Sequence, residues 1–500
     1  MKPTKFILLL FTAASFVLYS CGKNDSKEEA ETDGIESIIN MTLSTSSADA
    51  KENFGKALYQ FYVGEGTEAR NFFDAAITAD PNFALAYTFR AYTSQGPKDF
   101  ASFSNKANSL IANVSEAEKL LIELNQTYLK NDLDSRLNIA ESLVEKFPKN
   151  YIGRLELANA YSASDREEDS RQQLLQTITD NPDKARPLLD MANSFIFEDP
   201  KDLSKAEEYA KKSIEVIPDV ASTHIMLGDV YRAQNNLEGA LNAYKKASEV
   251  NPKNFVALSK QGHANTFLGN YDDAKANFAA AAELDDGGIG MINFTILTDV
   301  YAGNYEDALS QYQSEIAKID GSQSSRMNGN VSSLLSSAMQ VAYHSGNSEV
   351  LAAILPQYTE AEMKIAEDVG TEQVKTSIGA GLKNWEARLA ILNNDLETAK
   401  AKAEEYKSLM EPINNPNKMN GYYLGMGLIA LAESDAASAI EHLKKVDSQN
   451  IYAQFQLAKA LEMNDQTDEA MEIYKYLSTY NFNSTTYALM RSTCMSKVAE

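Results

Sequence analysis

The side chains best suited to metal binding or acid–base catalysis are the four histidines, His224, His263, His344 and His442. Either role requires a second ligand or titratable group at a fixed spacing from the histidine. No such neighbour recurs, and the sequence contains no His-Glu-x-x-His, Cys-x-x-Cys, Gly-x-Ser-x-Gly or P-loop pattern. We therefore expect the histidines to pack or to lie at the surface, and we predict no metal, no cofactor and no enzymatic activity.

Residues 285–290 combine acids with glycines, a composition that can hold calcium or phosphate. The segment reads Asp-Asp-Gly-Gly-Ile-Gly. It lacks the alternating oxygen ligands and the final Glu of an EF-hand, and it lacks the Lys-Ser/Thr of a phosphate-binding loop. Because glycine clusters between helical segments form turns, we interpret it as a turn between two helices.

The two cysteines are Cys21 and Cys494. Cys21 follows Phe6–Val17, an apolar run that is too short to cross a bilayer as a helix and that is preceded by Lys2 and Lys5. This arrangement is typical of a signal peptide that ends at residue 20. Cys494 lies in the last predicted helix, where we expect it to be buried as a small apolar residue.

The elements that position all these residues follow a 34-residue pattern written twice between residues 221 and 288. The equivalent pairs are Gly228 and Gly262, Ala240 and Ala274, Tyr244 and Phe278, and Ala247 and Ala281. The pattern predicts two antiparallel helices, with small residues at their closest approach and aromatic rings beside that contact. Pro252 ends the second helix, because proline has no amide hydrogen and disfavours helical geometry in the residue before it.

This pattern resembles the tetratricopeptide repeat (TPR). Leu227-Gly228-x-x-Tyr231, followed by Ala240, Tyr244 and Pro252, corresponds to the family pattern L-G-x-x-Y, A-x-x-x-F, P. The resemblance implies helical pairs that stack into a superhelix with one concave surface. It specifies an architecture and does not by itself specify a function.

Equivalent residues recur at the same offsets along most of the chain: Ala69, Phe73, Ala76 and Pro81; Leu157, Ala158, Tyr161 and Pro182; Gly303, Tyr305 and Ala308; Gly427, Ala439 and Leu443; Leu457, Ala458, Ala470 and Tyr474. We therefore predict an all-α fold, an α-α superhelix (TPR solenoid) of roughly twelve helical pairs, with a C-terminal capping helix at about residues 484–498. An irregular helical bundle is the alternative, above all for residues 325–411, where the repeat is weakest.

Composition predicts four segments. Residues 1–20 form the signal peptide, and residues 21–34 form a polar, acidic tether. Residues 35–322 form an N-terminal TPR array. A loop-like stretch at 321–332 separates it from residues 323–500, a divergent C-terminal array with the capping helix.

The first helix of each TPR pair lines the concave surface, and in the family its second, fifth, ninth and twelfth positions contact ligands. The resemblance therefore implies a set of ligand-facing residues, Asn159, Ser162, Phe195, Ile225, Asp229, Arg232, Ser259, His263 and Thr266. The mixture of polar groups and apolar anchors suits an extended peptide or a protein surface. The alternative is that these residues are only solvated.

Some TPR modules hold a C-terminal carboxylate with Lys and Asn at the fifth and ninth positions. Here those positions hold Ile225 and Asp229, or Ser259 and His263, so we expect no such clamp.

Acidic residues outnumber basic ones by 70 to 46, which gives a net charge of -24. This charge repels phosphate backbones, and we expect no nucleic-acid partner.

Leu18-Tyr19-Ser20-Cys21 resembles the bacterial lipoprotein signal, which implies a lipid anchor on Cys21; an ordinary cleaved signal peptide is the alternative. Ser26-Lys27-Glu28-Glu29 resembles a signal for the outer face of the outer membrane, although a solvated linker explains it equally well. Gly22 does not resemble an inner-membrane retention signal. These features predict a lipid-anchored outer-membrane protein on the periplasmic or cell-surface face.

Together, these features favour a TPR lipoprotein that binds a protein or peptide within an envelope assembly, secretion or surface complex. The alternative is a carbohydrate-capturing import lipoprotein of the SusD-like type, which also joins a lipid anchor to TPR helices. Sugar sites stack their ligands on flat rings carried by long loops. Trp385 is the only tryptophan and lies in a predicted helix, so the protein-binding interpretation is preferred.

Overall fold

The computed structural model describes residues 35–285, 289–318, 325–415 and 417–500. Across these ranges the regular elements are α-helices and one short 3-10 helix, η1 (Ile111–Asn113). The predicted signal peptide, Cys21 and the acidic tether lie outside the described residues. Of the predicted turn at 285–290, residues 286–288 also lie outside the described residues, and Ile289 and Gly290 begin helix α16.

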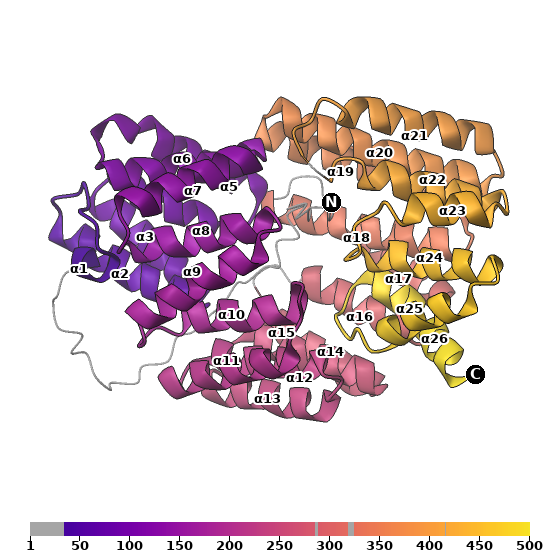
Figure 1. The fold of residues 1–500 in the computed structure, drawn as a ribbon, viewed down its shortest axis with the longest axis horizontal. Helices are drawn as coiled ribbons and strands as arrows, with labels where there is room; N and C mark the ends of the chain where they lie inside the picture. The colour runs from indigo at the N-terminus through magenta and orange to yellow at the C-terminus, as the bar shows by residue number, and fades with distance from the viewer. Residues whose placement is uncertain (1–34, 286–288, 319–324, 416) are drawn as a thin grey trace. The chain divides into compact units, whose positions relative to one another are not determined.

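Within the described ranges, helices α2 to α25 form twelve successive pairs, as Figure 1 shows. They are α2 (Ala48–Tyr62) with α3 (Gly66–Ala79), α4 (Ala84–Tyr92) with α5 (Pro97–Ser109), α6 (Glu116–Lys130) with α7 (Leu133–Lys146), α8 (Tyr151–Ala163) with α9 (Glu167–Asp180), α10 (Arg186–Phe197) with α11 (Leu203–Val216), α12 (Ala221–Ala233) with α13 (Leu237–Val250), α14 (Phe255–Leu268) with α15 (Tyr271–Leu284), α16 (Ile289–Tyr301) with α17 (Tyr305–Ala317), α18 (Ser325–His344) with α19 (Ser348–Val369), α20 (Glu372–Leu392) with α21 (Leu396–Met410), α22 (Asn420–Ala432) with α23 (Ala436–Leu443), and α24 (Ile451–Met463) with α25 (Thr467–Ser478). The short α1 (Ile35–Ile39) precedes the pairs and α26 (Thr485–Ala499) follows them. The all-α repeat architecture and its final helix are confirmed.

The two helices of a pair meet at the small and aromatic residues of the repeat. Ala240, Tyr244 and Ala247 of α13 have no exposed surface, and neither have their equivalents in α3 and α15. A Cβ on Gly228 would lie 2.3 Å from Cε1 of Tyr244, and a Cβ on Gly262 would lie 2.5 Å from Cε1 of Phe278. The rings therefore occupy the space that a side chain on the first helix would need.

The turn inside a pair uses a residue in the left-handed region. In ten of the twelve described pairs the turn contains one residue of positive φ: Gly64, Asn131, Asp165, Asn235, Gly269, Gly303, Gly346, Asn394, Ser434 and Asp465. Gly, Asn and Asp adopt this conformation at the lowest steric cost. In several pairs the next residue then caps the second helix: Asp395, for example, accepts a hydrogen bond from the Thr398 amide at 3.1 Å.

Residues 325–410 keep this turn geometry but have longer helices. α18, α19 and α20 contain 20, 22 and 21 residues, against 13 to 15 in most earlier helices. Left-handed Gly346 and Asn394 still separate the first helix from the second in both pairs. The divergence that the sequence shows here is therefore one of helix length.

The described residues form two compact units, divided within the α14–α15 pair. The N-terminal unit holds residues 35–264 and 276–285, and the C-terminal unit holds residues 265–275 and the described part of 289–500. In the C-terminal unit α26 packs on α16 and α18 as well as on α24 and α25. The boundary expected at residue 322 does not coincide with this division, because α26 ties α16 to the pairs at the end of the chain.

The N-terminal unit also brings its two ends together. The Ser222 hydroxyl, at the start of α12, donates to the Val63 carbonyl at 2.8 Å. Asn251, after α13, donates from Nδ2 to Oε1 of Glu65 at 3.2 Å. The turn between α2 and α3 therefore contacts the sixth pair, and this unit is a stack that closes on its own beginning.

We predict that Gly262→Leu lowers the free energy of unfolding by about 1–3 kcal/mol, because the new side chain meets the Phe278 ring in a packed core. Thermal unfolding followed by circular dichroism measures the change. Unchanged unfolding would show that the contact between α14 and α15 is not as close as described.

Gly381 in α20 is the matched control, since a Cβ there meets nothing within 4 Å. Gly381→Ala should be neutral or stabilising by up to about 1 kcal/mol, because glycine loses more backbone freedom than alanine in a helix. Gly262→Ala, the same chemical change, should be destabilising.

Candidate binding surface

Two of the ligand-facing residues expected on α12, Asp229 and Arg232, belong to one ionic network with Tyr244 and Lys260. Oδ1 of Asp229 accepts hydrogen bonds from the Tyr244 hydroxyl at 2.7 Å, from Nη2 of Arg232 at 2.7 Å and from Nζ of Lys260 at 2.9 Å. The His263 ring lies on the next helix turn from Lys260 and packs 5.1 Å from the Phe278 ring. One carboxylate is thus shared by two cations from successive first helices.

The network fixes the charge of each member. Burial would raise the pKa of the Asp229 carboxyl, but the charges of Lys260 and Arg232 and the Tyr244 hydroxyl outweigh it and lower that pKa. Burial, with the charges of Arg232 and Lys260, holds the pKa of His263 well below its usual range. At neutral pH the carboxylate is therefore ionised and the imidazole is neutral, which leaves His263 as a packing residue.

The other expected ligand-facing residues differ in exposure. Asn159 is exposed, and Ser162 and Ile225 are half-buried. Phe195 is buried, with the Arg171 guanidinium 4.3 Å from its ring centroid and the Tyr209 ring stacked on it at 6.0 Å. The buried set is Phe195, Arg232, Ser259, His263 and Thr266. Of the nine, Asn159, Ser162, Ile225 and Asp229 retain surface for contact in this structure.

A row of tyrosines on consecutive first helices forms a second part of the surface, in the N-terminal unit. Tyr62 ends α2, Tyr92 ends α4 and Tyr128 lies near the end of α6, and all three are half-buried. The Tyr92 and Tyr128 rings meet edge to face at 5.8 Å, and Tyr62 meets Tyr151 of α8 in the same way at 5.4 Å. Burial raises the pKa of the Tyr62, Tyr92 and Tyr128 hydroxyls, which therefore remain protonated donors.

Glu156 of α8 is the carboxyl at the centre of this row. The Tyr128 hydroxyl donates a hydrogen bond to Oε2 of Glu156 at 3.5 Å. The charge of Glu156 also contributes to the raised pKa of Tyr62 and Tyr92. Burial raises the pKa of Glu156 to about 7, against the opposing charges of Arg136 and Arg186. A neutral or half-ionised carboxyl among tyrosine hydroxyls can both donate and accept hydrogen bonds, as recognition of a peptide backbone requires.

Glu156 and Lys260 were missed in the sequence because both occupy the sixth position of their first helix, outside the family's usual contact positions. The signal was present in the chain. Glu156 stands between two apolar residues, Leu155 and Leu157, in a predicted helix. A charged residue within a helix face of that kind indicates a buried interaction or a site.

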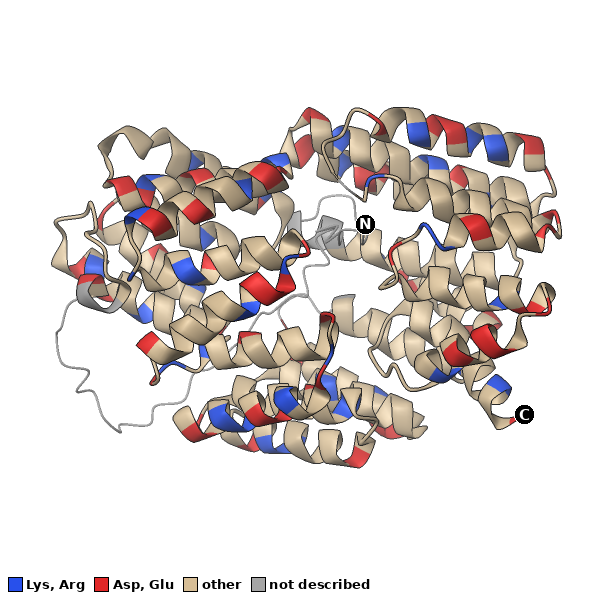
Figure 2. Ribbon diagram, viewed as in Figure 1, with Lys and Arg blue, Asp and Glu red and all other residues tan. Residues whose placement is uncertain are grey.

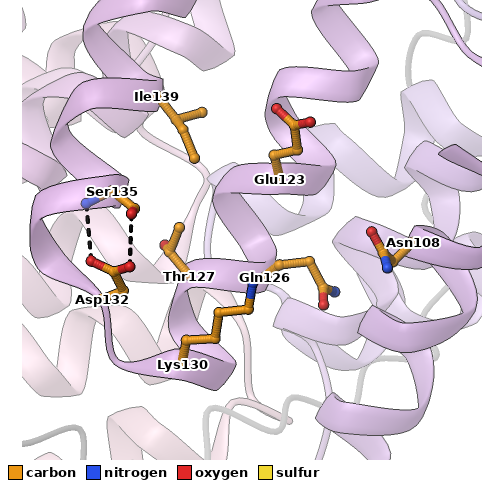
Figure 3. Close-up of a pocket in the computed structure, with 8 residues that line it drawn as sticks. All are labelled: Asn108, Glu123, Gln126, Thr127, Lys130, Asp132, Ser135 and Ile139. Carbon is orange, nitrogen blue, oxygen red and sulfur yellow. Dashed lines mark hydrogen bonds between the residues drawn. The ribbon is translucent and has the colours of Figure 1, made fainter.

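Figure 3 shows a pocket of about 230 Å³ among α5, α6 and α7. Its lining residues are Asn108, Glu123, Gln126, Thr127, Lys130, Asp132, Ser135 and Ile139. Asp132 is occupied as the cap of α7, accepting from the amide and hydroxyl of Ser135 at 3.0 and 2.7 Å. The pocket is smaller than the roughly 300–1,000 Å³ of most small-molecule sites, and we assign it no ligand.

Figure 2 shows acidic and basic residues interspersed over the helices, with no large patch of one sign standing out. Many pair three or four residues apart on the same helix, as Lys212 does with Glu208 at 2.6 Å. Exposed pairs of this kind contribute little to stability.

Across the described ranges, no three His, Cys, Asp or Glu side chains gather as metal ligands, and no described helix is long and apolar enough to span a bilayer. Cys494 is buried in α26, as expected.

Two TPR family models match this chain. One, described as TPR repeat, covers residues 228–266, and the other, described as tetratricopeptide repeat, covers residues 430–492. Among curated proteins, none matches. The first matched segment includes Gly228 and Gly262, and the second includes α23 to α25.

Several solved structures are similar to parts of the chain. A tetratricopeptide repeat protein from Parabacteroides merdae is 18% identical, with 57% of this chain and 98% of that chain covered and a TM-score of 0.34. The TPR domain of P58(IPK) is 16% identical, with 71% and 99% covered and a TM-score of 0.22. YrrB, described as a TPR protein with an unusual peptide-binding site, is 21% identical, with 36% and 91% covered and a TM-score of 0.27.

The chain contains TPR repeats, and its fold is the all-α TPR superhelix. TPR proteins generally mediate protein–protein interactions, and their scaffolds are typically not enzymes.

We predict that Glu156→Gln stabilises the protein at pH 8 by about 1–3 kcal/mol and leaves its stability at pH 4 unchanged. The folded state holds this proton up to about pH 7, whereas the unfolded chain releases it near 4.5. Folding therefore binds protons between these values, and wild-type stability falls as pH rises through that window. Unfolding by urea at the two pH values measures the difference.

Glu145→Gln, at an exposed position of α7, is the control and should change stability by less than about 0.5 kcal/mol at either pH. An equal effect of the two substitutions at pH 8 would mean that burial does not raise the pKa of Glu156 in the folded state.

Proposed function

We propose that this protein is a lipid-anchored scaffold that binds a protein or peptide along its first-helix surface, within an envelope assembly, secretion or surface complex, and performs no chemistry. The observation that carries the proposal is the row of tyrosines with Glu156 on consecutive first helices of the N-terminal unit. Tyrosine offers a large rigid contact area with a hydroxyl at its tip, the combination enriched at protein interfaces.

The spacing of the row supports an extended partner. Tyr62, Tyr92, Tyr128 and Glu156 come from four successive first helices, which pack about 8–10 Å apart in most helical proteins. A compact small molecule would contact one or two of these helices. A peptide strand or a protein edge contacts all four, with its backbone groups bonded to the hydroxyls.

The location belongs to the same proposal. Phe6–Val17 and Cys21 support a signal peptide and a lipid anchor, and an anchored superhelix would present its surface to a partner in the envelope. The outer membrane is the proposed site, on its periplasmic or cell-surface face.

The geometry around Trp385 does not favour the carbohydrate-capturing alternative. Only 8% of this side chain is exposed, the Arg388 guanidinium lies 4.6 Å from its ring centroid, and the Tyr358 ring meets it at 6.4 Å. Stacking on a sugar requires an open ring face, and both neighbours occupy that space. We propose no second function.

Photo-crosslinking in intact cells tests the binding surface. A benzoylphenylalanine at position 159 or 225, on first helices α8 and α12, is expected to form adducts with one envelope protein. The same residue at position 175, an exposed leucine on second helix α9, should form none. Mass spectrometry identifies the adducts. Equal yields from position 175 would place the partner on the second-helix face and contradict the proposal.

Metabolic labelling with an alkynyl fatty acid tests the anchor. The wild-type protein should carry the label and Cys21→Ser should lose it, because acylation requires the thiol. Cys494→Ser, which removes the other thiol, is the control and should keep the label. A wild-type protein without label would refute the lipid anchor and leave the binding proposal intact.

A further inference from the structure

The C-terminal unit holds an arginine surrounded by aromatic rings. The Arg388 guanidinium of α20 lies 4.6 Å from the ring centroid of Trp385, 5.6 Å from that of Tyr343 on α18 and 5.7 Å from that of Tyr452 on α24. Rings from three first helices of one unit, α18, α20 and α24, thus contact one cation. These helices are labelled in Figure 1. The rings fix the position of the guanidinium without using its N–H donors.

No acidic partner neutralises this arginine among the described residues. Its contacts there are the three rings, with no ion pair or hydrogen bond at the guanidinium. The nearby acid is Glu362 of α19, which accepts a hydrogen bond from Ser332, and burial raises the pKa of Glu362. Arg388 therefore keeps its charge and its five donors for an external group.

A second cation, Lys459, lies on α24, the helix that carries Tyr452. Tyr452, Gln456 and Lys459 are spaced four and three residues apart, so they share one helix face. Lys459 is exposed, and in the described chain its ammonium has no ion pair. His344 follows Tyr343 on α18. Burial and the positive charge of Lys459 both lower the pKa of His344. The imidazole is therefore neutral and adds no further charge.

We propose that Arg388 and Lys459 bind two carboxylates of an extended acidic peptide segment, which lies along the Tyr452–Lys459 face of α24. This proposal rests on the proposed function and names the chemistry of one partner segment. Guanidinium binds carboxylate through two parallel hydrogen bonds, and a ring-fixed guanidinium loses little side-chain entropy when it does so.

The separation of the two cations favours a peptide over a phosphate. A bound phosphate group needs several donors that converge on one point, whereas Lys459 lies about two turns of α24 from Tyr452, the ring that contacts Arg388. Most lysines and arginines of this acidic chain pair with neighbouring acids, so an acidic segment is repelled over most of the surface. Two unpaired cations on one face make a specific place where it is attracted.

Trp385 is the only tryptophan and lies beside Arg388, so its emission reports binding directly. Titration of the full chain with acetylated hexaglutamate should give a saturable change in emission, and hexaglutamine should give none. Anisotropy of dye-labelled hexaglutamate measures the variants. Arg388→Gln should weaken binding about tenfold or more, and Arg388→Lys by less, since lysine keeps the charge but loses the paired donors.

Lys459→Gln, at an exposed position that folding tolerates, should weaken binding about threefold to tenfold. Lys402→Gln is the charge-matched control, because Lys402 already pairs with Glu386 and Glu405, and it should leave binding unchanged. Hexaglutamate that binds equally to the wild type, Arg388→Gln and Lys459→Gln would overturn the proposal. The absence of hexaglutamate binding to the wild type would also overturn it. Displacement of the peptide by inorganic phosphate at the same concentration would do the same. Adducts at positions 159 and 225 test the N-terminal surface separately, so a failure here is distinguishable from a failure of the scaffold function.

Discussion

The rest of the fold depends on the contact between a glycine of one helix and an aromatic ring of the next. At Gly228 and Gly262 the ring of Tyr244 or Phe278 lies where a Cβ would be, which sets how close the two helices of a pair can come. The alanines on either side, buried completely, hold the same distance along the contact. Repeats with similar contacts inside each pair stack with a similar rotation, so within a unit the first helices follow one another along one surface.

The residues that make this contact could be read from the sequence, because they are small or aromatic and recur every 34 positions. The pairs, the final helix and the buried Cys494 follow from them. The contacts that join the first and last pairs of each unit could not be predicted from the repeat pattern. The hydrogen bond from Ser222 to the Val63 carbonyl depends on the rotation summed over five pairs, and no single repeat encodes that sum.

The candidate site was predictable as a surface and less so as particular residues. Position in the repeat indicates which way a side chain points, and Asn159 and Ile225 retain exposed surface as expected. Exposure also depends on what neighbouring helices supply. Arg232 is expected at the surface from its position, yet only 3% of its side chain is exposed, because Asp229 draws both it and Lys260 inward. Position within a single repeat therefore cannot predict an ion pair with a residue of the next repeat, such as that of Asp229 with Lys260.

The buried charges divide the chain's polar groups into two kinds. Surface pairs such as Lys212 with Glu208 have both side chains exposed to water, so they contribute to solubility but little to the stability of the fold. Where burial removes water, a charge must be compensated, and the described residues do this in different ways. In the N-terminal unit Glu156 gains a proton near neutral pH and Asp229 gains two cations. In the C-terminal unit Arg388 is compensated only by the quadrupoles of three rings, which is weaker than an ion pair. An incompletely compensated charge persists in a fold when water or a ligand completes it, and the ordered cage around Arg388 leaves its donors oriented for that ligand.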